Sequence, residues 1–288
     1  MKSKSQVKEL VMRIVFAGAA CLSILSVLLI CIFLFQNGIP TIMKIGPVKF
    51  LLGQKWMPGN NLFGIFPMIV GSIYVTIGAI IVGVPIGLLC AIYLARFASP
   101  RVHKILKPVV DLLAGIPSIV YGFFGLAALV PMISGMFADA SGKGLLTASL
   151  LLGIMILPTI ISVSEASLLA VPEQYYEGAL ALGATHERSV FAVIVPAAKS
   201  GITAAVILGV GRAIGETMAV IMIAGNQPIL PTSLLSGVRT MTANIVLEMG
   251  YASGLHREAL IATGVVLFVF ILIINLSVSL LNRRTLHE

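Results

Sequence analysis

Long apolar segments alternate with shorter polar ones along almost the whole chain. Crossing about 30 Å of hydrocarbon takes roughly 20 helical residues, and six segments satisfy this requirement. They cover residues 14–36, 65–95, 108–134, 145–168, 200–225 and 258–281. The pattern predicts an all-α integral membrane protein with six transmembrane helices. Gly83 and Gly87 have the four-residue spacing that favours close packing of such helices.

The composition supports this prediction. Of the 288 residues, 58% are hydrophobic and 10% are charged, and the mean hydropathy is +1.07, whereas a soluble domain has roughly 25% charged residues. Lys and Arg outnumber Asp and Glu, 19 to 11. Because the basic residues lie between apolar segments rather than on one polar surface, they do not indicate a nucleic-acid-binding protein. The three cysteines lack CxxC spacing and indicate neither a disulfide framework nor a zinc site.

The distribution of basic residues predicts the orientation of the chain. With the N-terminus inside, about twice as many lysines and arginines fall on inner segments as on outer ones, in agreement with the positive-inside rule. We therefore expect a multi-pass protein in contact with membrane lipid. It would have cytoplasmic termini at 1–13 and 283–288, a first transmembrane helix at 14–36, an outer loop at 37–64 and a core at 65–282 that holds the other five helices.

Residues 171–199, between the fourth and fifth predicted helices, form the longest inner connection and have a helical pattern of their own. Pro172 suits the first turn of a helix, Gly183 supplies a stop, and Thr185 is a candidate cap for a second short helix. An apolar stripe at helical spacing consists of Tyr176, Ala179, Leu180 and Gly183. A helix this short is not stable alone. We expect it to lie against lipid, against the inner ends of this protein's own helices, or in a groove of a soluble partner.

The same segment resembles the EAA loop of bacterial ABC importer permeases. That loop has Glu, Ala, Ala, three residues, Gly, and nine residues before an apolar triplet that ends in Pro. Here the pattern is Glu177, Gly178, Ala179 and Gly183, followed by the triplet before Pro196, with Gly178 in place of the usual Ala. The resemblance implies the type I (MetI-like) permease fold and a loop 172–192 that couples to an ATPase subunit. The docking residues that it implies are Glu173, Tyr176, Glu177, Gly178, Ala179, Leu180, Gly183, Ala184 and Thr185.

Motifs for chemistry on this chain itself are absent from the sequence. The Gly-Lys region at 135–144 lacks the spacing and the Ser or Thr of a phosphate-binding P-loop. His186 and Glu187 begin an incomplete H-E-x-x-H, because Val190 stands where the second His belongs. We expect no catalytic residue, no metal site and no cofactor on this chain, with ATP and Mg²⁺ on a partner ATPase. An intramembrane enzyme is therefore disfavoured.

Three further motifs resemble the two integral subunits of bacterial phosphate importers. They are "GIPSIVYG" at 115–122, "GRAIGETMAV" at 211–220 and "TANIVLEMG" at 242–250, and the last is closer to the PstC type than to the PstA type. The resemblance implies a permease subunit of an ATP-driven inorganic phosphate importer in a bacterial cell membrane. It also implies a PstA-like sister permease, two PstB-like ATPases and an extracytoplasmic PstS-like phosphate-binding protein as partners.

Arg212 and Glu216 are charged residues inside the fifth predicted helix, where a charge costs about 2.5 to 3.5 kcal/mol at the helix centre. Their i, i+4 spacing places both on one helical face, where they can partly neutralise each other. We expect Arg212 to meet a passing oxyanion, because a guanidinium presents paired donors, and Glu216 to hold it. The alternative is that the pair bridges two helices or two subunits. Gly211 and Gly215 are placed to let another helix approach that face.

Several assignments stay open at this stage. Ser118, Tyr121 and Thr217 either donate hydrogen bonds along a substrate pathway or bond to their own helices or to a neighbouring one. Lys107 and Asp111 are expected to form a shallow i, i+4 salt bridge. One arginine does not separate phosphate from sulfate or molybdate, and an ATP-independent anion channel or carrier remains the alternative class of transporter.

Overall fold

The structure is a computed structural model that describes residues 4–137 and 141–284. The helices are α1 (Lys4–Ile45), α2 (Pro47–Leu52), α3 (Phe66–Ile92), α4 (Pro100–Gly115), α5 (Ser118–Phe124), α6 (Val130–Met136), α7 (Leu145–Leu169), α8 (Glu173–Ala181), α9 (His186–Ser189), α10 (Val195–Ala197), α11 (Lys199–Gly215), α12 (Met218–Ile223), α13 (Met241–Met249) and α14 (Gly254–Arg284). The π-helical turns are η2 (Tyr93–Phe97), η3 (Gly125–Leu129) and η4 (Val190–Ile194), and η1 (Pro58–Asn60) is a 3-10 turn. Strands β1 (Trp56–Met57) and β2 (Leu62–Phe63) pair antiparallel.

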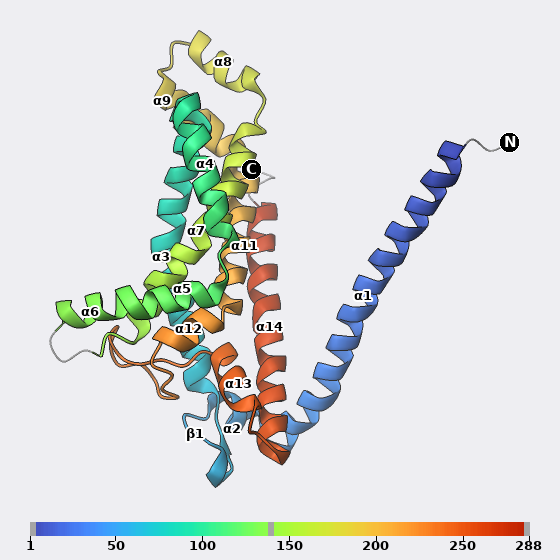
Figure 1. Ribbon diagram of the computed structural model, residues 1–288, viewed down its shortest axis with the longest axis vertical. Coiled ribbons are helices and arrows are strands. Elements are labelled where there is room, and N and C mark those ends of the chain that lie inside the picture. The colour runs from blue at the N-terminus through green and yellow to red at the C-terminus, as the bar shows by residue number, and fades with distance from the viewer. Residues whose placement is uncertain (1–3, 138–140, 285–288) are drawn as a thin grey trace.

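Long helices α3, α7, α11 and α14 run along the longest axis of the molecule, with α8 and α9 at one end and α2 and β1 at the other (Figure 1). Among the described residues, five helical stretches are long and apolar enough to span a membrane, and a bent pair supplies a sixth. This pair joins His186–Ala197 to Lys199–Gly215 at an angle of 69°. The protein is therefore a multi-pass membrane protein of all-α architecture, whereas which end faces the cytoplasm stays a prediction.

The first helix is longer than predicted. α1 continues to Ile45, beyond the expected end at residue 36, and takes in nine residues of the predicted outer loop. Its last turns pack against α14: an added Cβ at Gly38 would meet Ala262 and Val265, and the rings of Phe35 and Phe268 make an edge contact at 5.6 Å. This packing explains why the helix persists. The preceding part of α1 stands apart from the bundle (Figure 1), and none of the residues in its most apolar 18-residue window is buried.

The third predicted helix, 108–134, is wrong as a single element. α4 ends at Gly115, Ile116 and Pro117 are extended, and a new helical stretch runs from Ser118 to Met136. The break follows from Pro117, which has no N–H to continue the helix and disfavours helical backbone in the residue before it. α5 and α6 consequently lie across the bundle instead of along it (Figure 1).

The fifth predicted helix, 200–225, is also broken. α11 ends at Gly215, Glu216 is extended, and the short α12 begins at Met218. Before α11, helical backbone continues from α9 through η4 and α10 to Ala197, beyond residue 192, where the predicted coupling loop ends. The π-helical turn η4 ends at Ile194, two residues before Pro196, and single π-helical turns of this kind occur within longer α-helices.

The centre of the bundle is the contact between α3 and α7. An added Cβ at Gly83 would lie 2.7 Å from the Ile156 side chain, and one at Gly87 would lie 2.8 Å from Ile160. The predicted close packing at these two glycines is confirmed. Fully buried apolar residues around this contact hold α7 in place: Ala79, Leu151, Leu152, Met155, Ile156, Ile160 and Ile223.

A second cluster stabilises the opposite end from α8. Phe50 of α2 and Met68 of α3 are fully buried there. The polar contacts of this cluster centre on Glu248 of α13. It accepts hydrogen bonds from Trp56 Nε1 at 2.8 Å and from Arg239 Nη1 at 2.6 Å, and it contacts His256 Nε2 at 2.8 Å. The β1–β2 hairpin, α13 and the start of α14 are thereby joined.

Candidate functional site

Arg212 lies one turn before the end of α11 and is half-buried. Its Nη1 donates a hydrogen bond of 3.3 Å to the hydroxyl of Thr159, in the middle of α7. Within the described chain Arg212 forms no ion pair. Placing a guanidinium at membrane depth without a counter-ion costs free energy. A bound anion would lower this cost.

Glu216 does not pair with Arg212, so the predicted mutual neutralisation is wrong. Because α11 ends at Gly215, Glu216 is not on the same helical face. Its Oε1 instead accepts hydrogen bonds from the backbone N–H groups of Thr217 and Ala219, at 3.1 and 3.3 Å. These N–H groups belong to the first turn of α12, where helices leave donors unsatisfied and where the positive end of the dipole favours a carboxylate.

The three hydroxyl residues proposed for the pathway lie near the same break. Tyr121 is buried, and its hydroxyl donates to the carbonyl of Leu113 on α4 at 2.8 Å. Thr217 donates to the carbonyl of Gly215 at 3.2 Å. Tyr121 therefore bonds to the neighbouring helix α4 and Thr217 to the adjoining end of α11, while a role of either hydroxyl along a substrate pathway stays a prediction. Ser118 is half-buried at the start of α5.

Two sequence motifs meet through α5 and α12. An added Cβ at Gly122 would lie 2.9 Å from Cα of Ala219, so the two short helices touch backbone to backbone. This contact brings the segment 115–122 against the segment 211–220. In contrast, Gly211 and Gly215 have nothing near their Cβ positions. The α11 face that these glycines were expected to offer to another helix is therefore open in the single chain.

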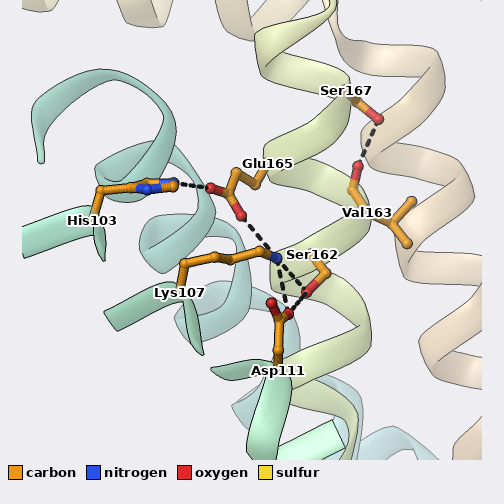
Figure 2. A network of polar contacts seen from close by, with 7 residues as sticks. All are labelled: His103, Lys107, Asp111, Ser162, Val163, Glu165 and Ser167. Atoms are coloured by element: carbon orange, nitrogen blue, oxygen red, sulfur yellow. Dashed lines mark hydrogen bonds and ion pairs between the residues drawn. The ribbon is translucent and has the colours of Figure 1, made fainter. Parts of the chain in front are cut away.

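A buried carboxylate that sequence reasoning overlooked lies further along α7. Glu165 is 4% exposed, and its two oxygens contact His103 Nε2 at 2.7 Å and Lys107 Nζ at 3.1 Å. Both partners come from α4, as Figure 2 shows. The signal was present in the sequence, because Glu165 is an acidic residue inside a segment that is otherwise apolar.

The predicted Lys107–Asp111 salt bridge is confirmed, at 3.1 Å, as part of the same network. Lys107 also donates to Ser162 Oγ at 2.9 Å (Figure 2). Burial by itself would lower the pKa of Lys107, but hydrogen bonds to Asp111 and Glu165 and the negative charge of both raise this pKa above its ordinary value. Lys107 is thus held as a cation, and α4 is fastened to α7 by charge.

Residues on α7 connect this network with Arg212. Thr159, Ser162 and Glu165 are three residues apart, so they form one polar stripe with a rise of about 4.5 Å per step. Thr159 contacts Arg212, while Ser162 and Glu165 contact Lys107. The stripe runs along the part of α7 between Arg212 and the end of the molecule that carries α8.

The predicted docking segment has the expected local structure. α8 begins directly after Pro172, Gly183 has the left-handed φ of +84°, and the Thr185 hydroxyl caps α9 by accepting from Arg188 N at 3.3 Å. Arg96, at the end of η2, holds the first residue of α8 through a 3.0 Å ion pair with Glu173. A second 3.0 Å bond joins Arg96 to the carbonyl of Leu168 on α7.

Part of the apolar stripe faces the protein's own helices. Tyr176 is half-buried against the cluster formed by Val190 and Ile194, and its hydroxyl lies 2.8 Å from Nδ1 of His186. Of the rest, Ala179 is half-buried and Leu180 and Gly183 are exposed. Among the nine predicted docking residues, Tyr176, Ala179 and Ala184 are half-buried, and Glu173, Glu177, Gly178, Leu180, Gly183 and Thr185 are exposed. Leu182, which was not predicted, is 91% exposed at the end of α8.

Residues 83–287 match the family described as binding-protein-dependent transport system inner membrane component. The chain belongs to this family. Among similar members, the probable ABC transporter permease protein YqgH of Bacillus subtilis is 37% identical, over 95% of this chain and 92% of its own length. The phosphate transport system permease protein PstC of Haemophilus influenzae is 37% identical over 77% of this chain and 76% of its own length, and PstC of Mesorhizobium japonicum is 35% identical over 78% and 75%.

Solved structures of the same fold include two ABC importers. A bacterial alginate ABC transporter in complex with its periplasmic protein matches with a TM-score of 0.63 at 16% identity, over 96% of both chains. The MetNI methionine ABC transporter matches with a TM-score of 0.57 at 20% identity, over 77% of this chain and 94% of that chain. The predicted fold of a type I ABC importer permease is therefore confirmed for this inner membrane component.

Proposed function

We propose that this chain is the permease subunit of an ATP-driven inorganic phosphate importer in a bacterial cell membrane. The observation that carries the choice of substrate is its similarity to several PstC phosphate permeases, which are 34 to 37% identical over about four fifths of the chain. The chemistry of Arg212 is consistent with it, because a guanidinium matches a tetrahedral oxyanion with paired N–H donors. Sulfate and molybdate have the same shape and are the competing substrates.

A second permease subunit, PstA-like, would complete the pathway. Arg212 is only half-buried, and the neighbouring glycines, Gly211 and Gly215, are open to contact. A sister chain packed on this face of α11 would enclose Arg212 in a channel between the two subunits, shielded from lipid. An extracytoplasmic PstS-like protein would then deliver the anion to the end of the bundle opposite α8.

ATP and Mg²⁺ would be bound by two PstB-like ATPase subunits and not by this chain. The exposed part of α8, with Leu180 and Leu182, offers an apolar surface to a cleft in such a subunit. Arg96, in the turn η2 that continues α3, contacts Glu173 of α8 and the carbonyl of Leu168 of α7, and so links these three elements. Movement of the ATPases would therefore be transmitted to the helices that surround Arg212. Under this proposal, α8 and both chain termini would face the cytoplasm.

Uptake of radiolabelled phosphate and sulfate, in cells that lack this gene and in cells that regain it, tests the substrate. We expect phosphate uptake to return with the gene while sulfate uptake is unaffected. Restored sulfate uptake with unchanged phosphate uptake would contradict the proposal. Purification of the chain with its neighbours tests the mechanism, because a channel or a carrier would not copurify with a nucleotide-binding subunit.

A further inference from the structure

A pocket of about 630 Å³ lies at the end of the molecule opposite α8. It is formed by the last turn of α1, by α2, by the segment that contains the β1–β2 hairpin and by the first turn of α14. Lys44, Lys49 and Lys55 line it, and no acidic residue does. All three lysines are exposed, and none of them forms an ion pair with a residue that the structure describes. Glu258 follows one turn after the lining residue Leu255 but does not line the pocket.

The walls of this pocket are held firmly. Phe50, next to Lys49, is fully buried, and the backbones of Gly53 and Gly64 are in direct contact. Lys55 precedes Trp56, which is buried and bonded to Glu248. The lysine backbones cannot separate easily, although like charges repel. Three cations held around one cavity form a site for an anion.

The pairing of α1 with α14 gives the level of the pocket in the membrane. The two helices are antiparallel, with Gly38 against Ala262 and Val265. Lys44, six residues further along α1, therefore lies level with residues 256–259 of α14. At that point the polar start of α14, His256 to Glu258, gives way to the apolar sequence that begins at Ala259. The lysines thus lie at the surface of the bilayer, where the headgroups are.

Much of the remaining lining of the pocket is apolar. Ile45, Leu62, Phe63 and Leu255 lie there, beside the polar residues Gln54 and Asn61. Met43 and Val48, beside the lysines in sequence, are 68% and 70% exposed. A free oxyanion would use the cations and leave the apolar walls uncovered. A ligand with an anionic head and a hydrocarbon body would satisfy both.

We propose that this pocket binds an anionic phospholipid, with Lys44, Lys49 and Lys55 around the headgroup phosphate and the start of the acyl chains along Met43 and Val48. Ammonium groups bind phosphate as point charges, and basic residues at the membrane surface attract anionic lipid. A lipid here would fill the angle between α1 and the hairpin and so fix the direction in which α1 leaves the bundle. The inference does not depend on which anion the protein transports.

Native mass spectrometry of the purified full-length complex, loaded from mixed phosphatidylglycerol and phosphatidylcholine, tests the proposal. We expect the wild-type complex to retain phosphatidylglycerol preferentially. Lys49→Gln should weaken this preference about fivefold, and the triple variant with Lys44→Gln and Lys55→Gln should abolish it, since each surface lysine contributes a similar amount. Lys143→Gln, on a loop outside the pocket, is the matched control and should leave the preference unchanged. Three Lys→Arg substitutions should preserve it.

Two results would overturn the proposal. One is a triple variant that assembles and still retains phosphatidylglycerol as the wild type does, or that differs no more than the Lys143→Gln control. The other is displacement of the lipid by inorganic phosphate at millimolar concentration, which would make the pocket a site for a free oxyanion. Assembly of every variant is checked by copurification of the partner subunits.

Discussion

Arg212 Nη1 and Thr159 Oγ1 lie 3.3 Å apart, and this hydrogen bond joins the last turn of α11 to the middle of α7. The bond is long and its acceptor is neutral, so it offsets little of the cost of placing a guanidinium at membrane depth. Under the proposed function, Arg212 would exchange this weak neutral partner for the transported anion.

Replacing Arg212 by Ala is expected to lower phosphate uptake about 10- to 100-fold, because a hydrogen bond to a charged group contributes about 1.5 to 3 kcal/mol. Uptake of radiolabelled phosphate in cells measures this loss. Thr159→Val, which removes the hydroxyl alone, should have a clearly smaller effect. Both variant complexes should still assemble. Uptake at the wild-type rate by the Arg212→Ala protein would remove the anion-binding role.

Glu216→Ala is expected to lower the stability of the purified complex by about 1 kcal/mol, as removal of a side chain that caps a helix does. Glu216→Gln keeps an oxygen that can accept from Thr217 N and Ala219 N, so its thermal unfolding should stay close to that of the wild type. If the Gln variant were as unstable as the Ala variant, the carboxylate would have an electrostatic role that these two hydrogen bonds do not explain.

Parts of this fold could be predicted from local sequence. Pro172, Gly183 and Thr185 each impose a backbone conformation or a cap within a few residues, and the structure has α8, the left-handed turn and the cap of α9 as expected. The apolar segments likewise predicted the first, second, fourth and sixth membrane helices, whereas the third and fifth are broken. That these residues dock on an ATPase stays a prediction, because docking is a property of two chains.

The errors have a common cause. The i, i+4 argument for Arg212 and Glu216 assumed one continuous helix, and the break after Gly215 depends on donors at the start of α12 that a periodic pattern does not reveal. Glu165 was overlooked because its partners, His103 and Lys107, are 62 and 58 residues away in sequence. Contacts of this range depend on how α4 packs on α7, and the sequence of either helix alone does not contain that information.

The network around Glu165 should fasten α4 to α7. Lys107→Met leaves a carboxylate that is 4% exposed, with His103 Nε2 as its remaining side-chain contact among the described residues. We expect a loss of about 1 to 3 kcal/mol in the stability of the complex, between the values for exposed and buried ion pairs. Lys104→Met, an exposed lysine one turn earlier on α4, is the control and should change stability little.

A double-mutant cycle distinguishes this pairing from a general effect of charge. Adding Glu165→Gln to Lys107→Met should restore part of the lost stability, because the uncompensated buried charge is then removed. Thermal unfolding of the four proteins in one detergent measures the coupling. Additive losses would show that Lys107 and Glu165 do not act as a pair.

Substitutions at Gly183 test whether the turn between α8 and α9 couples ATP hydrolysis to transport. Its φ of +84° is unfavourable for any residue with a Cβ, at a cost of roughly 1 to 2 kcal/mol. Gly183→Val should therefore change the direction of the chain between α8 and α9 and lower phosphate uptake relative to ATP hydrolysis by the complex. Gly183→Asn, which tolerates this conformation, should be less severe. Gln174→Ala is the control, because Gln174 is exposed on α8 and is not among the predicted docking residues. It should leave the ratio of transport to hydrolysis unchanged. Equal ratios for wild type and Gly183→Val would show that the turn between α8 and α9 does not transmit the movement of the ATPase.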